Sequence, residues 1–241
     1  MKKLLFLLFI PIGCFAAKTN ETADFAAKMG LVLPEPGVHV RPISAMSSKL
    51  TPDEKNNVLI AHKKIQTMGY YETENGKVKT MLQMRTQHAL SPGLNNPQDT
   101  KLKSRIEDVG LAFRFQGVPD VTDENIVGYA AIGAYIKNGW TGITELFTDQ
   151  ELGVCQYDLY NIKLTHGAVF IPQELVSYDV NHKPTLIDVR GNTRSGFMYK
   201  VHWADNKSMN DLYCAHMQFD KHKTDRLIEL AKKIDKTLEA F

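Results

Sequence analysis

Between Trp140 and Gln218 the sequence alternates apolar and polar residues in short segments separated by turn formers, and this pattern limits the fold more than any other feature. Alternation with a period of two is typical of strands with one buried face. In the clearest case, residues 196–203, Lys200 and His202 would face away from Phe197, Tyr199, Val201 and Trp203. The turn at residues 204–207 would lead into the next strand. We therefore predict an antiparallel meander with strands over residues 141–148, 153–164, 167–172, 185–190, 196–203 and 211–218.

An amphipathic helix is predicted after the meander, over residues 222–239. Its apolar residues recur at helical spacing, and this stripe consists of Leu227, Leu230, Ile234 and Leu238. Glu229 and Lys233 are four residues apart and are expected to pair on the exposed side of the helix. The pattern as a whole predicts an α+β domain over residues 105–241. Its antiparallel sheet of about five to seven strands would be packed by the C-terminal helix and one internal helix.

The internal helix is predicted over residues 122–139, which can be interpreted in two ways. Residues 122–124 resemble a helix start and residues 137–139 a helix stop. Gly128 and Gly133 are unfavourable in a helix, and the last two residues of this segment, Asn138 and Gly139, could also turn a hairpin. We favour a buried helix and keep the hairpin as the alternative. A strand is expected before it, over residues 109–116.

Residues 17–104 are predicted to form a partly extended N-terminal arm. After a short helix at residues 19–30, prolines are frequent from residue 31 to residue 52, which favours an extended tether. The sequence Thr51-Pro52-Asp53-Glu54 predicts the start of a helix over residues 52–68. Asn75-Gly76 predicts a hairpin over residues 70–84. A loose boundary, rich in turn formers, would follow at residues 89–104.

The first sixteen residues have the layout of an export signal, with two lysines, an apolar run and then small residues. The apolar run has about nine residues, whereas a membrane-spanning helix needs about 20. We therefore predict a signal peptide over residues 1–16 and no membrane span after its removal. Cleavage before Ala17 would release a soluble product. Cys14 could instead become a lipid anchor, but Pro11 stands where a lipidation motif normally has Leu, so we favour the soluble product.

Signal removal affects both charge and cysteine content. Loss of Lys2 and Lys3 reduces the 29 basic residues to 27, equal to the 27 acidic residues. A neutral chain lacks the positive charge that nucleic-acid binding requires. Cys155 and Cys214 remain, and in an oxidising compartment we expect them to form a disulfide. Its loop of about 60 residues would stabilise the fold by about 4 kcal/mol.

No catalytic signature with a recognised spacing occurs in the sequence, and it indicates no cofactor or metal site. If Trp203 opposes Asp211 in the last hairpin, then His202, Lys200, Cys214 and His216 share one face. This face would be either an acid–base patch or an ordinary polar surface. Similarly, the turn holding Arg190 and Arg194 could bind a carboxylate or phosphate, or be only a hairpin tip. Glu145, Asp149 and Glu151 could be paired carboxylates, although surface acids are the simpler interpretation.

These features favour a non-enzymatic exported protein of the bacterial envelope, periplasmic or associated with the outer membrane. Such a protein would bind other envelope proteins, for example within a secretion system. One alternative is a secreted hydrolase whose site is assembled from His202, His216 and Asp205. Another is a small-ligand or cell-wall binding module that uses Arg190 and Arg194.

Overall fold

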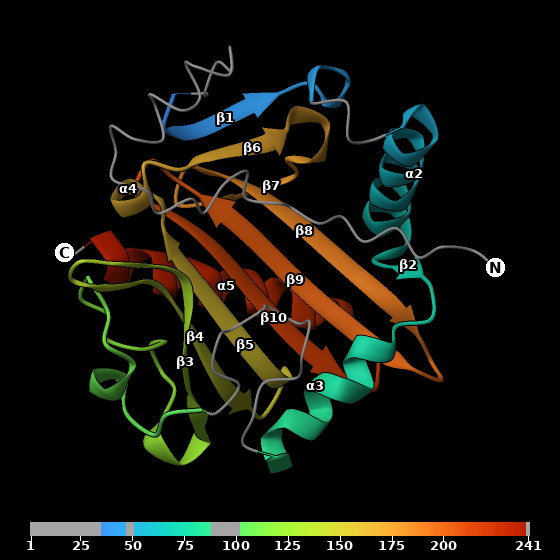
Figure 1. Cartoon of the computed structure of the whole chain (residues 1–241). Coiled ribbons are helices and arrows are strands. Elements are labelled where there is room, and N and C mark those ends of the chain that lie inside the picture. Colours follow the sequence, from blue (N-terminus) through green and yellow to red (C-terminus); the bar gives the residue numbers. More distant parts are fainter. Residues whose placement is uncertain (1–34, 47–50, 88–101, 240–241) are drawn as a thin grey trace.

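The computed structural model describes residues 35–46, 51–87 and 102–239 (Figure 1). Over these residues it shows the predicted α+β fold, with a mostly antiparallel main sheet of eight strands and a second sheet of two. The main sheet has the order β2 (Tyr71–Glu72), β8 (Lys183–Asn192), β9 (Gly196–Ala204), β10 (Ser208–His216), β5 (Gly153–Asn161), β4 (Gly139–Asp149) and β3 (Ile126–Ile136). β7 (Tyr178–Val180) also pairs with β8. The predicted signal peptide, Cys14 and the predicted helix at 19–30 lie outside the described residues.

Each of the six strands predicted between residues 141 and 218 has a counterpart in the structure, with three differences. The last strand, β10, covers residues 208–216 instead of 211–218. Residues 162–164 belong to the short helix α4 (Ile162–Thr165), because the Asn161 side chain accepts the Leu164 N–H at 3.0 Å and caps it. β6 (Ala168–Pro172) is not part of the meander. It pairs in parallel with β1 (Gly37–Arg41) to form the second sheet.

The predicted tether at residues 31–52 is therefore wrong for its central part. Beyond β1, the 3₁₀ turn η1 (Ile43–Ala45) buries Ile43 against Val58 and Ile171. The Ile43 N–H also donates to the Glu174 carboxylate at 2.8 Å. The prolines favour extended backbone here, as expected, but the apolar residues between them join this segment to the domain.

The helix predicted at residues 122–139 is wrong, and the hairpin alternative is correct. After the short turn η3 (Asp123–Asn125), β3 and β4 form an antiparallel pair joined at residues 137–138. Gly133 has φ 78° and Gly139 has φ 127°, which other residues rarely adopt. A Cβ on Gly139 would lie 2.4 Å from the Gly110 carbonyl oxygen. The glycines are required by this hairpin.

The strand predicted at residues 109–116 is also wrong. The 3₁₀ turn η2 (Ile106–Val109) precedes irregular backbone, in which only Leu111 forms an isolated bridge, with Trp140. Its apolar side chains still pack on the sheet, including Val109 and Phe115. The alternating apolar residues therefore belong to a buried loop. Among the residues described, no strand pairs with this segment along its length.

The helix α2 (Pro52–Met68) forms as predicted, with Thr51 and Glu54 in a reciprocal capping box and Gly69 at its end. The hairpin predicted at residues 70–84 is wrong. Only β2 is extended, and α3 (Gly76–Gln87) follows it. The Asn75 side chain accepts the Lys77 N–H at 3.2 Å and so caps a helix. Val78, Met81 and Met84 recur at helical spacing and are buried on the sheet.

The helices cover both faces of the main sheet (Figure 1). α5 (Lys221–Glu239), predicted from its apolar stripe, packs on one face, against a core that includes Tyr199 and Trp203. α2 and α3 pack on the other face. The expected Glu229–Lys233 pair is wrong: Glu229 pairs with Lys232 at 2.8 Å, and Lys233 pairs with Asp120.

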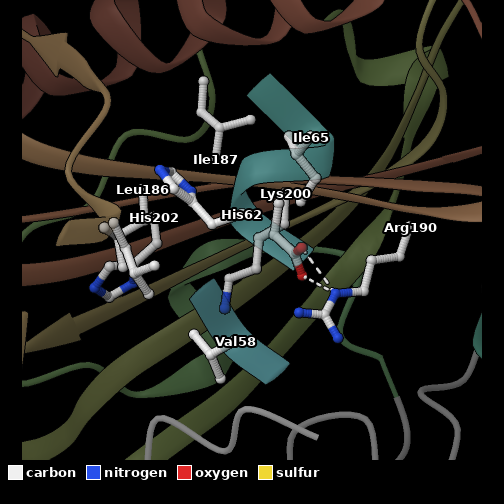
Figure 2. A pocket seen from close by; sticks show the side chains of 10 residues that line it. Val58, His62, Ile65, Leu186, Ile187, Arg190, Lys200 and His202 are labelled. Carbon is white, nitrogen blue, oxygen red and sulfur yellow. Dashed lines mark hydrogen bonds and ion pairs between the residues drawn. The ribbon is translucent and has the colours of Figure 1, made fainter. Parts of the chain in front are cut away.

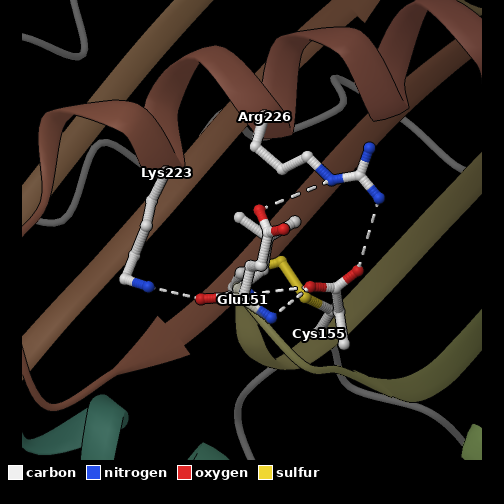
Figure 3. Close-up of a disulfide and its surroundings, with 7 residues drawn as sticks. Glu151, Cys155, Lys223 and Arg226 are labelled. Atoms are coloured by element: carbon white, nitrogen blue, oxygen red, sulfur yellow. Dashed lines mark hydrogen bonds and ion pairs between the residues drawn. A yellow bond between two sulfur atoms is a disulfide. The ribbon is translucent and has the colours of Figure 1, made fainter.

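The predicted disulfide between Cys155 and Cys214 is present (Figure 3). The two residues oppose each other on β5 and β10, with their Cα atoms 4.1 Å apart, and both are fully buried on the face that α5 covers. Nearby, Lys223 of α5 donates to the backbone carbonyl of Glu151 in the turn before β5. None of the helices within the described ranges has the length and apolar character needed to cross a membrane.

Candidate functional site: a polar pocket between α2 and the sheet

Polar side chains form two rows across the sheet face on which α2 and α3 pack. In one row the register places Asp158 opposite Asp211, and Asp211 opposite His202. In the next row Gln156, Tyr213, Lys200 and Asp188 are opposed in the same way. Opposed residues of antiparallel strands lie on the same face, so four adjacent strands contribute to one polar cluster.

Asp211 is the centre of this cluster. Its Oδ1 atom lies 2.8 Å from Lys200 Nζ and 2.9 Å from His202 Nδ1. Burial by itself would raise the pKa of Asp211. Lys200 and His202 outweigh this effect and hold the pKa well below its usual range. Asp211 is therefore ionised at neutral pH and fixes the positions of both basic side chains.

Asp158 has a different environment, although it lies directly opposite Asp211. It is fully buried, and its carboxylate accepts hydrogen bonds from Thr144 Oγ1 at 2.6 Å and Gln156 Nε2 at 3.0 Å. Burial raises the pKa of Asp158 to about 7, because these two bonds only partly offset the loss of hydration. The two aspartates thus differ in protonation below neutral pH, with Asp158 neutral and Asp211 charged.

A pocket opens at one end of the cluster, between α2 and the strands β8 and β9 (Figure 2). Its cavity volume is about 70 Å³, well below the several hundred Å³ of a site for a drug-sized ligand. It combines four basic and one acidic side chain with apolar ones. The lining residues are Val58, His62, Ile65, Leu175, Leu186, Ile187, Asp188, Arg190, Lys200 and His202.

Two basic residues of the pocket, Arg190 and His62, have side-chain nitrogens without a hydrogen bond to any protein group in the described part of the chain. Arg190 uses Nε to contact both carboxylate oxygens of Asp188, each at 2.8 Å, and its guanidinium carbon lies 5.7 Å from the centre of the Tyr71 ring. His62 Nε2 is buried and has no hydrogen-bond partner there. Burial lowers the pKa of His62, although Asp188 acts in the opposite direction. His62 is thus mainly neutral at pH 7.

The structure does not bring the three residues of the hydrolase hypothesis together. His202 is 1% exposed and pairs with Asp211, whereas His216 lies on the opposite face, where its ring is close to the Gln218 carbonyl. Asp205 is in the β9–β10 turn and pairs with Lys183 at 3.1 Å.

The expected register of this hairpin is wrong by one residue, because Trp203 opposes Asn210 instead of Asp211. The turn is closed by a backbone bond from Asp205 to Ser208, and the Asp205 carboxylate accepts the N–H groups of Lys207 and Ser208. As a result Lys200 and His202 share a face with Asp211, and Cys214 and His216 lie on the other.

The two arginines of the proposed binding turn are held separately. Arg190 lies on β8 and pairs with Asp188, while Arg194 is exposed at the tip and pairs with Glu74 at 3.3 Å. The carboxylates considered as a pair are also apart. Glu145 is buried on the α5 side of the sheet. Asp149 and Glu151 lie at the β4–β5 turn, within 4.0 Å of Arg226.

Three members of the site, Asp158, Asp211 and His62, are not predicted from the sequence. Polar residues at alternate positions of β9 and β10 were the available signal for Asp211, but the one-residue register error placed Asp211 on the wrong face. His62 comes from a helix distant in the sequence, and no local pattern marks it. Over the ranges that the structure describes, no three His, Cys, Asp or Glu side chains are grouped to hold a metal ion.

Comparison of the chain with protein-family models, curated proteins and solved structures finds no match.

Proposed function

We propose that the chain is a non-enzymatic exported protein of the bacterial envelope that binds other envelope proteins. It would be periplasmic or associated with the outer membrane, as a component of an assembly such as a secretion system. Two features support export. The first sixteen residues have the layout of a signal, and the Cys155–Cys214 disulfide is of the kind that persists in oxidising compartments.

The observation that carries the binding proposal is an aromatic pair beside the β3–β4 turn, in which Tyr135 of β3 is exposed and Trp140 of β4 is half-buried. Tyr135 is 63% exposed and stacks edge-on against Trp140, with ring centres 5.3 Å apart. β3 is the last strand in the order of the main sheet. Aromatic side chains are enriched at protein interfaces, and a strand at a sheet edge can pair with a strand of a partner. Lys103 already exchanges two backbone hydrogen bonds with Tyr129 of β3, at 2.7 and 2.8 Å, so a partner strand would pair beyond this bridge, beside Tyr135.

The polar cluster around Asp211 is consistent with a non-enzymatic role. Lys200 and His202 are held by Asp211, and His202 is almost completely buried. Charged groups that satisfy one another in a buried position fix a structure more readily than they act on a substrate.

The binding surface is tested with two tyrosine variants expressed in the native host. Tyr135→Ser removes the exposed ring from β3, and Tyr178→Ser removes a ring that is 45% exposed on β7. We expect the unsubstituted protein to run as a complex in native gels of envelope fractions. Tyr135→Ser should reduce the fraction in complex about tenfold, and Tyr178→Ser should leave it unchanged.

Two results would contradict the binding proposal: recovery of the unsubstituted protein only as a free monomer, or equal losses in the two variants.

Export is tested separately by the intact mass of the protein from its host. The expected product begins at Ala17, and acyl chains on Cys14 would show an anchored form instead. A product that retains Met1 would contradict export.

A further inference from the structure

The pocket between α2 and β8 presents an arginine whose donors are only partly used. Arg190 contacts Asp188 through Nε, and its two Nη groups have no hydrogen bond within the described part of the protein. The Nη groups of a guanidinium can donate two parallel bonds to a carboxylate or phosphate. The Arg190 side chain is only 23% exposed, so its contact with Asp188 holds the donors at the pocket (Figure 2).

His62 lines the same pocket from another element and would be a second donor in the tautomer that carries the proton on Nε2. The ring comes from α2, whereas Arg190 comes from β8, so the two lie on different elements that pack together. A neutral imidazole carries one N–H, and Nε2 of His62 is buried with no protein partner among the residues described. An acceptor in the pocket would give this nitrogen the hydrogen bond that the described protein groups do not.

The other lining residues make the pocket suitable for a small charged group. Lys200 contributes a second permanent positive charge, and Asp188 and Asp211 balance the charges of Arg190 and Lys200. An incoming anion therefore does not meet an excess of negative charge. The apolar lining residues, which include Val58, Ile65 and Leu186, lower the polarity of the pocket walls, and this strengthens charge-assisted bonds.

We propose that this pocket binds an oxyanion, the carboxylate or phosphate group of a small molecule, with Arg190 and His62 as donors. A cavity of about 70 Å³ holds one such group, and the remainder of the ligand would extend outside. The proposal is independent of the binding surface at Tyr135, which lies on another strand at the edge of the sheet.

The test is a titration of the full chain with inorganic phosphate or with acetate at constant ionic strength, followed by backbone amide shifts in NMR spectra. We expect saturable shifts in residues around the pocket. Arg190→Gln should weaken binding at least tenfold, and His62→Leu should weaken it by a smaller factor. Arg194→Gln is the matched control, because Arg194 is on the same hairpin but is 86% exposed and pairs with Glu74.

Each outcome distinguishes the sources of the anion or rejects the site. Saturation by phosphate alone indicates a phosphorylated ligand, saturation by acetate alone indicates a carboxylate, and saturation by both supports the shared chemistry. Absence of saturable shifts with either probe overturns the proposal, as does equal weakening by Arg190→Gln and Arg194→Gln. Arg190→Lys keeps the charge but not the paired donors. It should bind with intermediate affinity, which separates loss of binding from loss of folding.

Discussion

The indole N–H of Trp203 donates to the Asp235 carboxylate at 3.0 Å, and this bond joins the middle of the sheet to the C-terminal helix. Lys183 donates to the same oxygen at 2.7 Å, and Asn181 donates to the other at 3.0 Å. Asp235 and Trp203 are both at most 1% exposed. α5 is therefore positioned by a buried polar anchor as well as by its apolar stripe.

We expect Asp235→Ala to lower the free energy of unfolding by about 3 kcal/mol, because it leaves the Trp203 N–H and the Lys183 ammonium short of an acceptor. Lys183 keeps its pair with Asp205, which limits the loss. Urea unfolding measures the effect. Glu229→Ala is the control on the same helix, because Glu229 is exposed and pairs with the partly exposed Lys232, and we expect a change below about 0.5 kcal/mol. Equal losses in both variants would reject the anchor.

Removal of the disulfide should destabilise the fold without changing it. For Cys155→Ala/Cys214→Ala we expect the free energy of unfolding to fall by about 4 kcal/mol, from the loop of 59 residues that the bond closes. Both residues are fully buried, so reductant should act on the native protein only slowly. Alkylation before and after reduction in denaturant counts the thiols. Two thiols alkylated without reduction would show that the bond is absent.

Glu145 should make stability depend on pH. Burial raises its pKa to about 7, although the Val118 N–H, which bonds Oε2 at 2.9 Å, acts in the opposite direction. Oε1 has no partner among the described residues. The folded pKa lies above the ordinary value of 4.5, so the folded state binds more protons between these two values. The contribution of Glu145 is thus fully present below pH about 4.5 and is lost as the pH rises through about 7, at a total of about 3 kcal/mol.

Glu145→Gln removes this part of the pH dependence, because an amide does not ionise. The measurement is urea unfolding at pH 5 and pH 8 for both proteins. We expect the difference between the two pH values to shrink in Glu145→Gln. Asp158, whose pKa is also about 7, retains its own share of the dependence in the same direction. An unchanged difference would mean that Glu145 is ionised in the folded protein throughout this range.

Two glycines should respond in opposite ways to alanine. Gly139→Ala should cost more than about 2 kcal/mol, because φ is 127° and the new Cβ would be 2.4 Å from a backbone oxygen. Gly76→Ala should be neutral or stabilise by about 0.5 kcal/mol, because Gly76 begins a helix and a Cβ there meets nothing within 4 Å. Thermal unfolding compares the two. A harmless Gly139→Ala would contradict the tight approach to Gly110.

The elements predicted correctly are those whose local signals and tertiary packing agree. Thr51 and Glu54 cap α2 reciprocally, and the apolar stripe of α5 faces the sheet, so pattern and structure coincide. Around Asn75-Gly76 the local signal had two interpretations, since the same pair can turn a hairpin or begin a helix. Burial of Val78 and Met81 decided between them. Gly128 and Gly133 disfavour a helix at residues 122–139, and in the structure this outweighs the helix-like residues at the two ends of the segment.

The candidate site was less predictable than the fold because it depends on register and on distant contacts. The pairing of β9 with β10 is predicted correctly, but the register differs by one residue. Asp211 opposes His202 where the expected register has Leu212, and Cys214 moves to the other face. Arg190 was singled out as an anion-binding residue, but its expected partner Arg194 points to Glu74. His62 is on α2, and only the packing of α2 on β8 brings it near Arg190.

The parallel pairing of β1 with β6 has a mechanical consequence. The rungs run from Gly37–Ala168 to Arg41–Pro172, and one further bond joins the Gly37 N–H to the Gly167 carbonyl at 2.9 Å. A pulling force applied to the chain before Glu35, along the direction of β1, would act on all the hydrogen bonds between β1 and β6 at once, in shear. It would not break them one after another from one end. If Cys14 or a bound partner tethers that end, the two-stranded sheet would serve as the force-bearing clamp that keeps the domain attached.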